Sequence, residues 1–488
     1  MTASGPEMTK NTEQQTPPRE QGGRPPKAGD RPSSFSLDVE RRSIADAARQ
    51  YVGRLRSGEP GALPSVLGIA VLAIIFSQVS SRFISKYNIG NIPGQGAYIA
   101  LIAMGLVFVL LLGEIDLSGG TTGGMCAGFA AQAIFSHGLK DGIPTALYWV
   151  LIIGMLALAA LGFYLKSISG PIIVVLGVVV LLTNLDQHEV FALFFAIALG
   201  CAVGIFIGWL VASVGIPSFI VTLALFLAWQ GVLLFALRSQ SKSVNTYGLW
   251  NNLANGNLSP LWSWVFTIVV VGGYLVVTLT RSLRAQAKGL TADSVSLVLL
   301  RAGIVAAIGI VLTILANQNR NILAIATTEG IPYAAAIPVG MMIIATIALN
   351  HTHWGRHLFA TGGNAEAARR AGIDVTHIRV TAFTVSGGFA ALGGLFLASS
   401  AGAVVLNLGG GNILLFSVAA AVIGGTSLFG GRGRPRDAII GALVIAIIPN
   451  GIGLKPNLGP EYQQVITGAV LLVAATVDAL SRRRARTD

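Results

Sequence analysis

The sequence predicts an all-α, polytopic transmembrane helical bundle, and three observations lead to that fold class. Of the 488 residues, 53% are hydrophobic and 11% charged, with a mean hydropathy of +0.70, whereas soluble domains carry about 25% charged residues. Apolar runs near the ~20 residues needed to cross a bilayer recur along the chain. These runs are continuous, as in 268–279, and do not alternate as barrel strands do. Helices satisfy their own backbone hydrogen bonds in lipid, so we expect helices.

We place about 14 candidate spans, with a range of 10–14. The spans lie near 62–80, 95–112, 119–136, 145–165, 170–184, 189–213, 217–237, 262–280, 296–316, 331–349, 380–399, 412–428, 437–450 and 463–480. The runs 170–184 and 437–450 are short for a span. The glycine-rich run 119–136 is either a span or a re-entrant segment.

The two ends of the chain differ from this pattern. Residues 1–33 are rich in Pro, Gln, Glu, Gly and Arg, so we expect a disordered cytoplasmic tail. Residues 34–57 place apolar side chains at helical spacing between arginines, which is typical of a basic amphipathic helix at the inner membrane face; an ordinary solvated helix is the alternative. The transmembrane domain then covers 58–481, and 482–488 is a basic cytoplasmic tail.

The distribution of positive charge predicts the topology. If the N-terminus is inside, the inner loops of the second half hold Arg281, Arg284, Lys288, Arg356, Arg369, Arg370, Arg379, Arg432, Arg434, Arg436, Arg482, Arg483, Arg484 and Arg486, whereas the outer loops hold Arg238, Lys242, Arg320 and Lys455. This asymmetry places both termini and a loop at 350–379 in the cytoplasm. Because the net charge of +12 flanks the spans, it indicates contact with membrane lipid and no nucleic-acid partner.

The first polar motif, GEIDLSGG at 113–120, ends a strongly apolar span. An Asp at the centre of a membrane helix costs about 2.5–3.5 kcal/mol, so Glu114 and Asp116 require an interface, a water-filled cavity or a helix break. Ser118 or Asp116 is placed to cap the helix that follows. Two interpretations stay open: a broken helix beside a substrate path, or a capped loop end.

A second motif, GGTSLFGG at 424–431, shares four of eight positions with the first and adds Thr426 and Ser427 as candidates. Gly-interrupted segments at corresponding places are what repeated halves of a transporter leave in sequence. Because only four positions are identical, two interpretations are equal alternatives: the chain consists of two pseudo-repeated halves, or the similarity is a coincidence.

The loop 350–379 is the longest polar stretch between spans, and its core is GGNAEAARRAGI. Asn364 is placed to cap a short helix over 365–371, with Glu366 in its first turn and Gly372 closing it. A helix of about two turns is not stable alone in water, so it should pack on a partner or on the membrane face. His351, His353 and His357 lie nearby without a carboxylate or cysteine, so we expect no metal site.

Other chemistry is not indicated. No lysine follows a glycine, so the chain lacks the GxxxxGK[ST] phosphate loop, and no GxSxG or HExxH motif is present. Cys126 and Cys201 lie within apolar runs and are expected to be small buried side chains. We therefore predict no catalytic residues and no cofactor.

Taken together in this order, GEIDLSGG, GGNAEAARRAGI and GGTSLFGGRG resemble the permease subunits of ribose- and xylose-type ABC sugar importers. The basic N-terminal segment and the ending NGIGLKPNLGPEYQQVITGAVLLVAATVDAL look most like the xylose branch, as does Glu114. The resemblance covers roughly 34–484. Two departures stand out: the commoner family pattern is GGIDLSVG, and the stretch 139–186 carries runs that ribose-type permeases lack.

The resemblance implies a permease homodimer in the bacterial cytoplasmic membrane that moves a monosaccharide, with a pentose such as D-xylose expected. It also implies an ABC ATPase with two fused nucleotide-binding domains and an extracytoplasmic sugar-binding protein as partners. By position, the ATPase-coupling residues are Gly363, Asn364, Glu366, Arg369, Arg370 and Gly372. The alternative from another class is an ion-coupled secondary transporter that uses Glu114 and Asp116.

Overall fold

The computed structural model describes residues 63–289, 292–320, 327–455 and 461–470, together with the single residues 41, 42, 49, 53, 457, 459, 472 and 476. In the first half of this part, the helices are α2 (Leu63–Val79), α3 (Lys86–Leu111), α4 (Gly119–Phe135), α5 (Leu139–Gly142), α6 (Thr145–Tyr164), α7 (Ser169–Leu182), η1 (Leu185–Gln187), α8 (Glu189–Trp209), η2 (Leu210–Val214) and α9 (Ser218–Ala236).

The second half continues with α10 (Gly248–Asn255), α11 (Pro260–Ala287), α12 (Val295–Ala316), α13 (Tyr333–His351), α14 (His353–Gly363), α15 (Ala365–Arg370), α16 (Val375–Ala401), α17 (Ile413–Gly424) and α18 (Pro435–Gly453). Residues 461–470 are helical as well. The strands are two residues each: β1 (Arg41–Arg42) pairs in parallel with β3 (Ala292–Asp293), and β2 (Lys242–Ser243) pairs antiparallel with β4 (Ala403–Val404).

The all-α membrane bundle is confirmed. Within the described residues, nine helices are long and apolar enough to cross a membrane: α3, α6, α8 with η2, α9, α11, α12, α13, α16 and α18. Helices also form at the predicted runs 62–80, 119–136, 170–184 and 412–428, but they are shorter than the 18 residues required of a span. The last predicted run, 463–480, lies partly outside the described residues.

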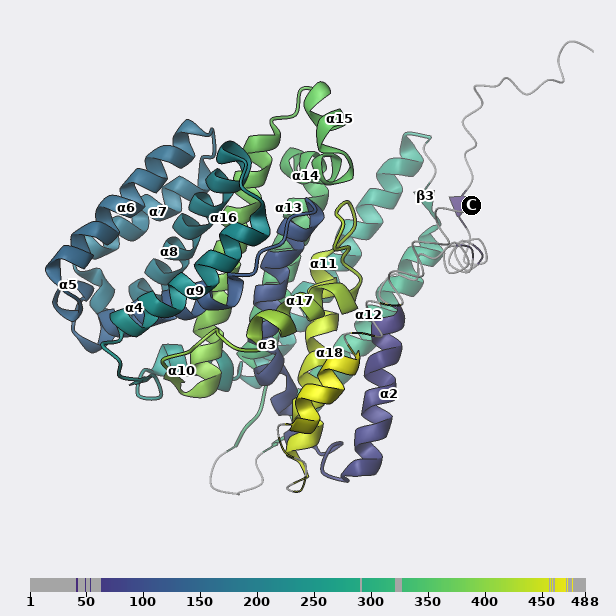
Figure 1. The fold of residues 1–488 in the computed structure, drawn as a ribbon. Helices are drawn as coiled ribbons and strands as arrows, with labels where there is room; N and C mark the ends of the chain where they lie inside the picture. Colours follow the sequence, from purple (N-terminus) through teal and green to yellow (C-terminus); the bar gives the residue numbers. More distant parts are fainter. Residues whose placement is uncertain are drawn as a thin grey trace, which may run out of the picture.

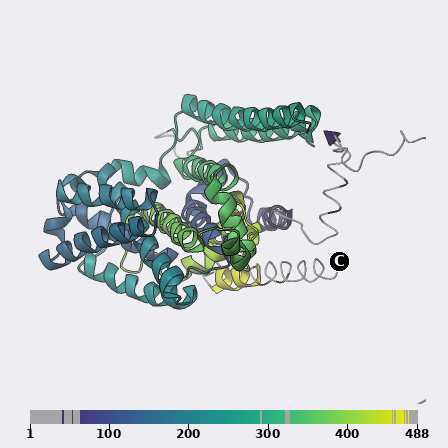
Figure 2. The same ribbon diagram turned by 90° about the horizontal axis from the view of Figure 1, so that it is seen from above.

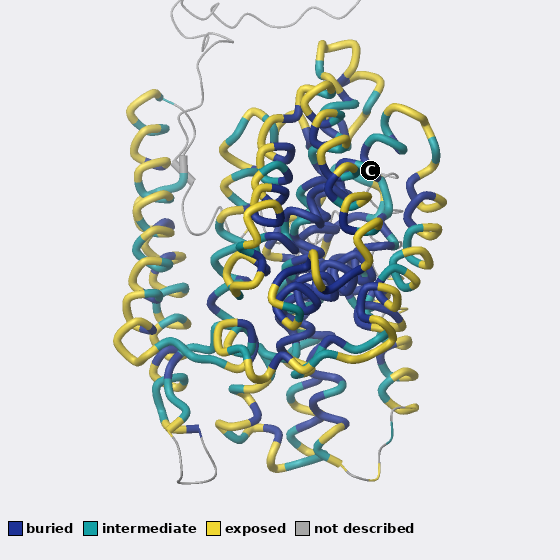
Figure 3. Tube along the Cα trace, turned by 90° about the vertical axis from the view of Figure 1, so that its left-hand side faces the viewer, coloured by how far each residue is buried: buried dark blue, intermediate teal, exposed yellow. Residues whose placement is uncertain are grey.

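The core is organised around α16, which packs against α8, α3 and α4. Figure 3 shows the buried residues gathered in the centre of the bundle and the exposed ones on its periphery. Glycines allow this close packing, since a Cβ at Gly387 of α16 would overlap the carbonyl oxygen of Gly200 in α8. Small residues at helix contacts are the usual means by which membrane helices approach one another.

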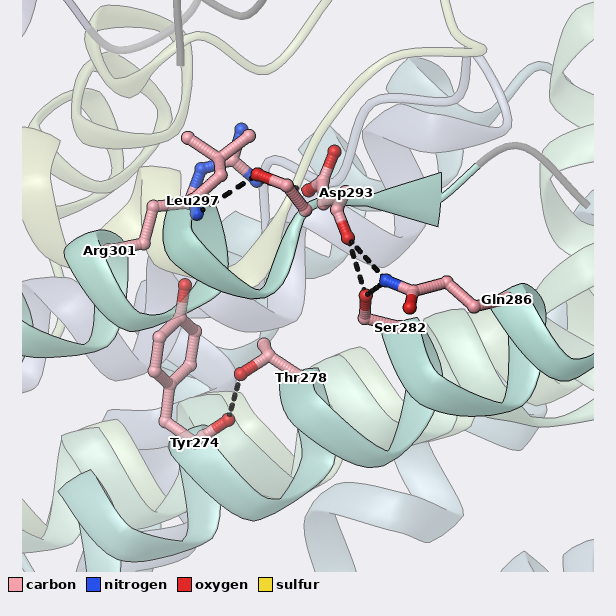
Figure 4. Close-up of polar contacts among 8 residues, drawn as sticks. Tyr274, Thr278, Ser282, Gln286, Asp293, Leu297 and Arg301 are labelled. Atoms are coloured by element: carbon pink, nitrogen blue, oxygen red, sulfur yellow. Dashed lines mark hydrogen bonds and ion pairs between the residues drawn. The ribbon is translucent and has the colours of Figure 1, made fainter. Parts of the chain in front are cut away.

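The α11–α12 hairpin stands beside the main body (Figure 2). Its two helices are joined by a hydrogen bond of 2.5 Å between the Thr267 and Thr313 hydroxyls. At its far end, the Ser282 hydroxyl donates to the Asp293 carbonyl oxygen at 2.6 Å, and the Arg301 guanidinium pairs with the Asp293 carboxylate at 2.6 Å (Figure 4). These contacts connect α11, α12 and the intervening strand β3 to one another.

Two residues of the predicted N-terminal helix 34–57 lie at the same place. Its residues Arg41–Arg42 form β1 against Ala292–Asp293, so these two residues are extended and not helical as predicted, because their backbone pairs with the hairpin. Arg49 and Gly53 are helical. The other residues of the segment, and all of 1–33 and 482–488, lie outside the described residues.

The bundle has two ends that carry different loops (Figure 1). One end carries α14 and α15, and the other carries α10. We call them the α15 end and the α10 end. The α15 end holds the arginines of the 350–379 loop, which the charge distribution predicts to be cytoplasmic; that orientation stays a prediction.

Candidate functional site

The short helix α15 lies in the predicted loop and begins and ends as its sequence indicates. The Asn364 side chain accepts a hydrogen bond of 3.0 Å from the Ala367 amide. Glu366 pairs with Arg369 and Arg370, each at 3.2 Å. Gly372 has a φ of +84° and follows the helix in a Schellman arrangement, in which its amide donates to the Arg369 carbonyl and the Ile373 amide to the Ala368 carbonyl, both at 3.0 Å.

The helix α15 also has the partner surface that its short length requires, and that surface comes from the chain itself. Ala368 is buried, and α15 packs against α14 and α16. In contrast, Glu366, Arg369 and Arg370 keep between 57% and 79% of their side-chain surface exposed. The result is a preformed helix that presents one acid and two arginines to the outside.

Three segments far apart in sequence meet directly beneath α15. The amide of Gly431 donates to the Leu111 carbonyl at the end of α3, at 2.9 Å. Gly362, in the last turn of α14, lies so close that a Cβ there would overlap the Leu111 carbonyl oxygen and come within 3.2 Å of the Gly431 nitrogen. We call Leu111, Gly362 and Gly431 the glycine junction. It links the 350–379 loop to the ends of both Gly-rich motifs.

Glu114 belongs to the same end of the bundle. Its carboxylate pairs with the Arg379 guanidinium of α16 at 3.2 Å, and the two side chains keep only 15% and 28% of their surface exposed. Gly113 has a φ of +75°, and the amides of Gly113 and Glu114 close α3 by donating to Leu110 and Val109. Glu114 thus ties the chain reversal after α3 to the first turns of α16.

Asp116 lies deeper and is buried. One carboxylate oxygen accepts from the Ser118 amide at 2.8 Å and from the Ser118 hydroxyl at 2.7 Å, and the other lies 3.5 Å from the Ser386 hydroxyl. Ser386 is close to the middle of α16. The segment 113–118 therefore turns back into the bundle, and α4 begins near its mid-depth.

A second short helix, α17, starts beside the beginning of α4. A Cβ on Gly120 would come within 2.5 Å of the Gly409 carbonyl oxygen and 3.5 Å of Ile413, the first residue of α17. From there α17 runs toward the glycine junction. Helix N-termini carry a partial positive charge, and broken helices that begin at mid-depth are typical of transport proteins.

Thr426 and Ser427 are brought to the α15 end, apart from the site of Asp116. Both are buried, and they follow Gly425, whose φ is +117°. The Ser427 hydroxyl accepts from the Phe429 amide at 3.1 Å, and the Ser427 amide donates to the Arg432 carbonyl at 2.8 Å. Both residues lie in the turn between α17 and α18, and the two Gly-rich motifs approach each other at their α15 ends, where Gly113 lies near Phe429 and Gly430.

Neither histidines nor cysteines form a site in the described part of the chain, where no group of three or more His, Cys, Asp or Glu side chains is arranged to hold a metal. His353 Nδ1 lies 2.9 Å from the Arg356 guanidinium. Cys126 and Cys201 are free and buried.

Sequence reasoning missed Ser386, Gly362 and the pairing of Arg379 with Glu114. Ser386 lies in an apolar run and gives no signal of its own. The sequence did carry a signal for the Glu114–Arg379 pair, since Glu114 follows one apolar span and Arg379 precedes another. Two charges at one depth of a bundle are expected to pair.

Known proteins are similar to this chain along most of its length. The model of the family described as "Branched-chain amino acid transport system / permease component" matches residues 167–475. The xylose transport system permease protein XylH of Haemophilus influenzae is 30% identical over 421 residues, which is 86% of this chain and 96% of that protein. XylH of Escherichia coli K12 is 28% identical over 417 residues (85% and 91%), and the ribose import permease protein RbsC of the same strain 26% over 418 residues (85% and 92%). No solved structure matches the chain.

Proposed function

This chain belongs to that permease family, as a permease of the xylose and ribose type, and on that premise we propose that it carries a pentose such as D-xylose across the cytoplasmic membrane. The resemblance seen in the three motifs is thereby confirmed. The chain is a multi-pass membrane permease of this kind. Membership of this family implies an ATPase and a binding protein as partners. Two fused nucleotide-binding domains in that ATPase, a permease homodimer and cytoplasmic termini remain parts of the proposal.

The observation that carries the proposed mechanism is the connection between α15 and the glycine junction. An ATPase that binds Glu366, Arg369 and Arg370 at the surface would pull on α14, whose Gly362 lies against the Leu111 carbonyl and beside Gly431. The two helices that begin at mid-depth are connected to the junction: α4 follows Leu111 in the chain, and α17 precedes Gly431. Movement of the loop would therefore reach the ends of α3 and α17 directly, through the contacts of the glycine junction.

The pairing of the two acids supports ATP coupling over ion coupling. A coupling ion needs carboxylate oxygens free to bind it, whereas Glu114 is paired with Arg379 and Asp116 accepts from Ser118. Both carboxylates already have partners within the protein, so neither is free to bind a coupling ion.

The test is sugar uptake by the full chain reconstituted in liposomes with its ATPase and binding protein. We expect uptake of D-xylose to require ATP and to persist when ionophores collapse all ion gradients. Uptake that follows an imposed ion gradient without ATP contradicts the proposal. Comparison of D-xylose, D-ribose and D-glucose in the same liposomes tests the choice of sugar.

A further inference from the structure

A polar cavity of about 330 Å³ lies at the α10 end, opposite the glycine junction. The first turns of α3 form one wall, and α10, the end of α16 and the residues around Arg320 and Pro332 form the others. Its volume falls at the lower limit of pockets that hold small ligands, about 300–1,000 Å³. None of the motifs that led to the proposed function contributes to it.

Arg320 is the charged group of this cavity, and 92% of it is buried. Its guanidinium donates to the Asn257 side-chain oxygen at 2.9 Å and to the Gly330 carbonyl at 2.7 Å, while its buried Nε has no hydrogen-bond partner among the residues that the structure describes. It lies against α3, since a Cβ on Gly90 would come within 2.5 Å of Nη1. Burial lowers the pKa of Arg320.

Amide side chains face the same space. Asn91 and Gln95 lie one turn apart on α3 and line the cavity, and neither side-chain amide is bonded to another group in the described part of the chain. Asn255 donates through Nδ2 to Asn251 and to the Ser399 carbonyl, which leaves its side-chain oxygen as an acceptor. The exposed ring of Tyr87 stands at the rim.

This set of groups fits a neutral sugar. Each hydroxyl of a sugar both donates and accepts a hydrogen bond, as amides do, and the arginine adds fixed donors. The described residues that line the cavity include no carboxylate. A ring such as that of Tyr87 offers an apolar face to the C–H groups of a sugar and a polar tip to its hydroxyls.

We propose that the cavity between α3, α10 and Arg320 is a monosaccharide site, where a neutral sugar is held at the α10 end before it enters the bundle. This proposal rests on the proposed function and adds to it a place for the sugar on the permease itself. The residues that bind the sugar are Asn91, Gln95, Asn255 and Arg320, and Tyr87 covers it.

Cysteine protection tests the proposal on the full chain in liposomes. Asn91→Cys is treated with a membrane-impermeant maleimide, and the native Cys126 and Cys201 give little background because they are buried. At a D-xylose concentration ten times the Kd, labelling should slow about tenfold, because the free fraction falls as 1/(1 + [L]/Kd). Ser241→Cys, exposed beside β2 at the same end, is the matched control and should label at the same rate with or without sugar.

A second variant separates a bound sugar from a general change in shape. Gln95→Leu removes the amide without breaking a bond within the described chain, and we expect it to raise the sugar concentration for half-protection of Asn91→Cys by about tenfold, the effect of losing about 1.4 kcal/mol of binding. Protection by the anionic sugar acid D-xylonate but not by D-xylose overturns the choice of a neutral ligand.

The outcomes distinguish this site from the proposed function. If ATP-driven uptake is intact and no sugar protects Asn91→Cys, the cavity is not a sugar site and the proposed function stands. If D-xylose protects the cysteine but uptake follows an ion gradient without ATP, the site stands and the proposed ATP coupling fails.

Discussion

The glycine junction gives the sharpest prediction, because two adjacent glycines of α14 differ only in what surrounds them. In Gly362→Ala the new Cβ would lie 2.9 Å from the Leu111 carbonyl carbon, besides overlapping its oxygen. In Gly363→Ala the new Cβ meets nothing within 4 Å. Both changes replace glycine at the end of the same helix, where alanine is favoured by up to about 1 kcal/mol. Gly363→Ala is therefore a matched control.

The magnitude follows from the distances. Carbon atoms in contact prefer about 3.5 Å or more, so α14 and α3 must separate by at least about 0.6 Å, and the Gly431–Leu111 hydrogen bond, now 2.9 Å, is strained or lost. Overpacking of this kind costs about 1–3 kcal/mol. We expect Gly362→Ala to lower thermal stability and Gly363→Ala to leave it unchanged or raise it.

The assay is thermal unfolding of the purified full chain, combined with ATP hydrolysis and sugar uptake in liposomes. If force passes through the junction, Gly362→Ala should lose more uptake than ATP hydrolysis, whereas Gly340→Ala in α13, where a new Cβ also meets nothing within 4 Å, keeps the wild-type ratio. Equal stability of Gly362→Ala and Gly363→Ala would refute the close packing at Gly362, and a wild-type ratio in Gly362→Ala would refute its role in coupling.

Three further predictions concern other contacts of the site. Glu114→Arg and Arg379→Glu should each reduce uptake and the double exchange should restore part of it, with a coupling of about 0.5–3 kcal/mol in a double-mutant cycle; additive losses would show that the pair is unimportant. Asn364→Ala removes the α15 cap, costing about 1 kcal/mol, and should speed amide hydrogen exchange in α15 while leaving that of α18 unchanged. Asp116→Ala should reduce uptake more than Asp478→Ala, since Asp478 lies in sequence at the end of the last predicted span, close to Arg482; equal effects would mean that the 113–118 reversal has no special role.

Helix positions followed from hydropathy where a helix crosses the bundle without interruption. The predicted runs 145–165 and 296–316 agree closely with Thr145–Tyr164 and Val295–Ala316. Hydropathy failed at α3, which begins at Lys86, nine residues before the predicted run, because its first turns are polar and include Pro93. Those polar turns line the cavity at the α10 end, so the error lies at a candidate binding site.

The short helix α15 was predictable because its signals are local: a capping Asn, an acid in the first turn and a terminal glycine. The glycine junction was not, because it depends on contacts between residues 111, 362 and 431, and a glycine in sequence does not reveal which backbone lies against it. The start of α4 at mid-depth likewise depends on Asp116 meeting Ser386, 270 residues away.

The central claim is that the exposed face of α15 receives the force of ATP hydrolysis. The most direct measurement is ATP-driven D-xylose uptake, with co-purification of the ATPase, for Glu366→Arg and for the control Arg356→Glu, an equally large charge change at an exposed site of α14. We predict that Glu366→Arg loses both uptake and bound ATPase and that Arg356→Glu retains them. Wild-type uptake and ATPase binding in Glu366→Arg would contradict the claim.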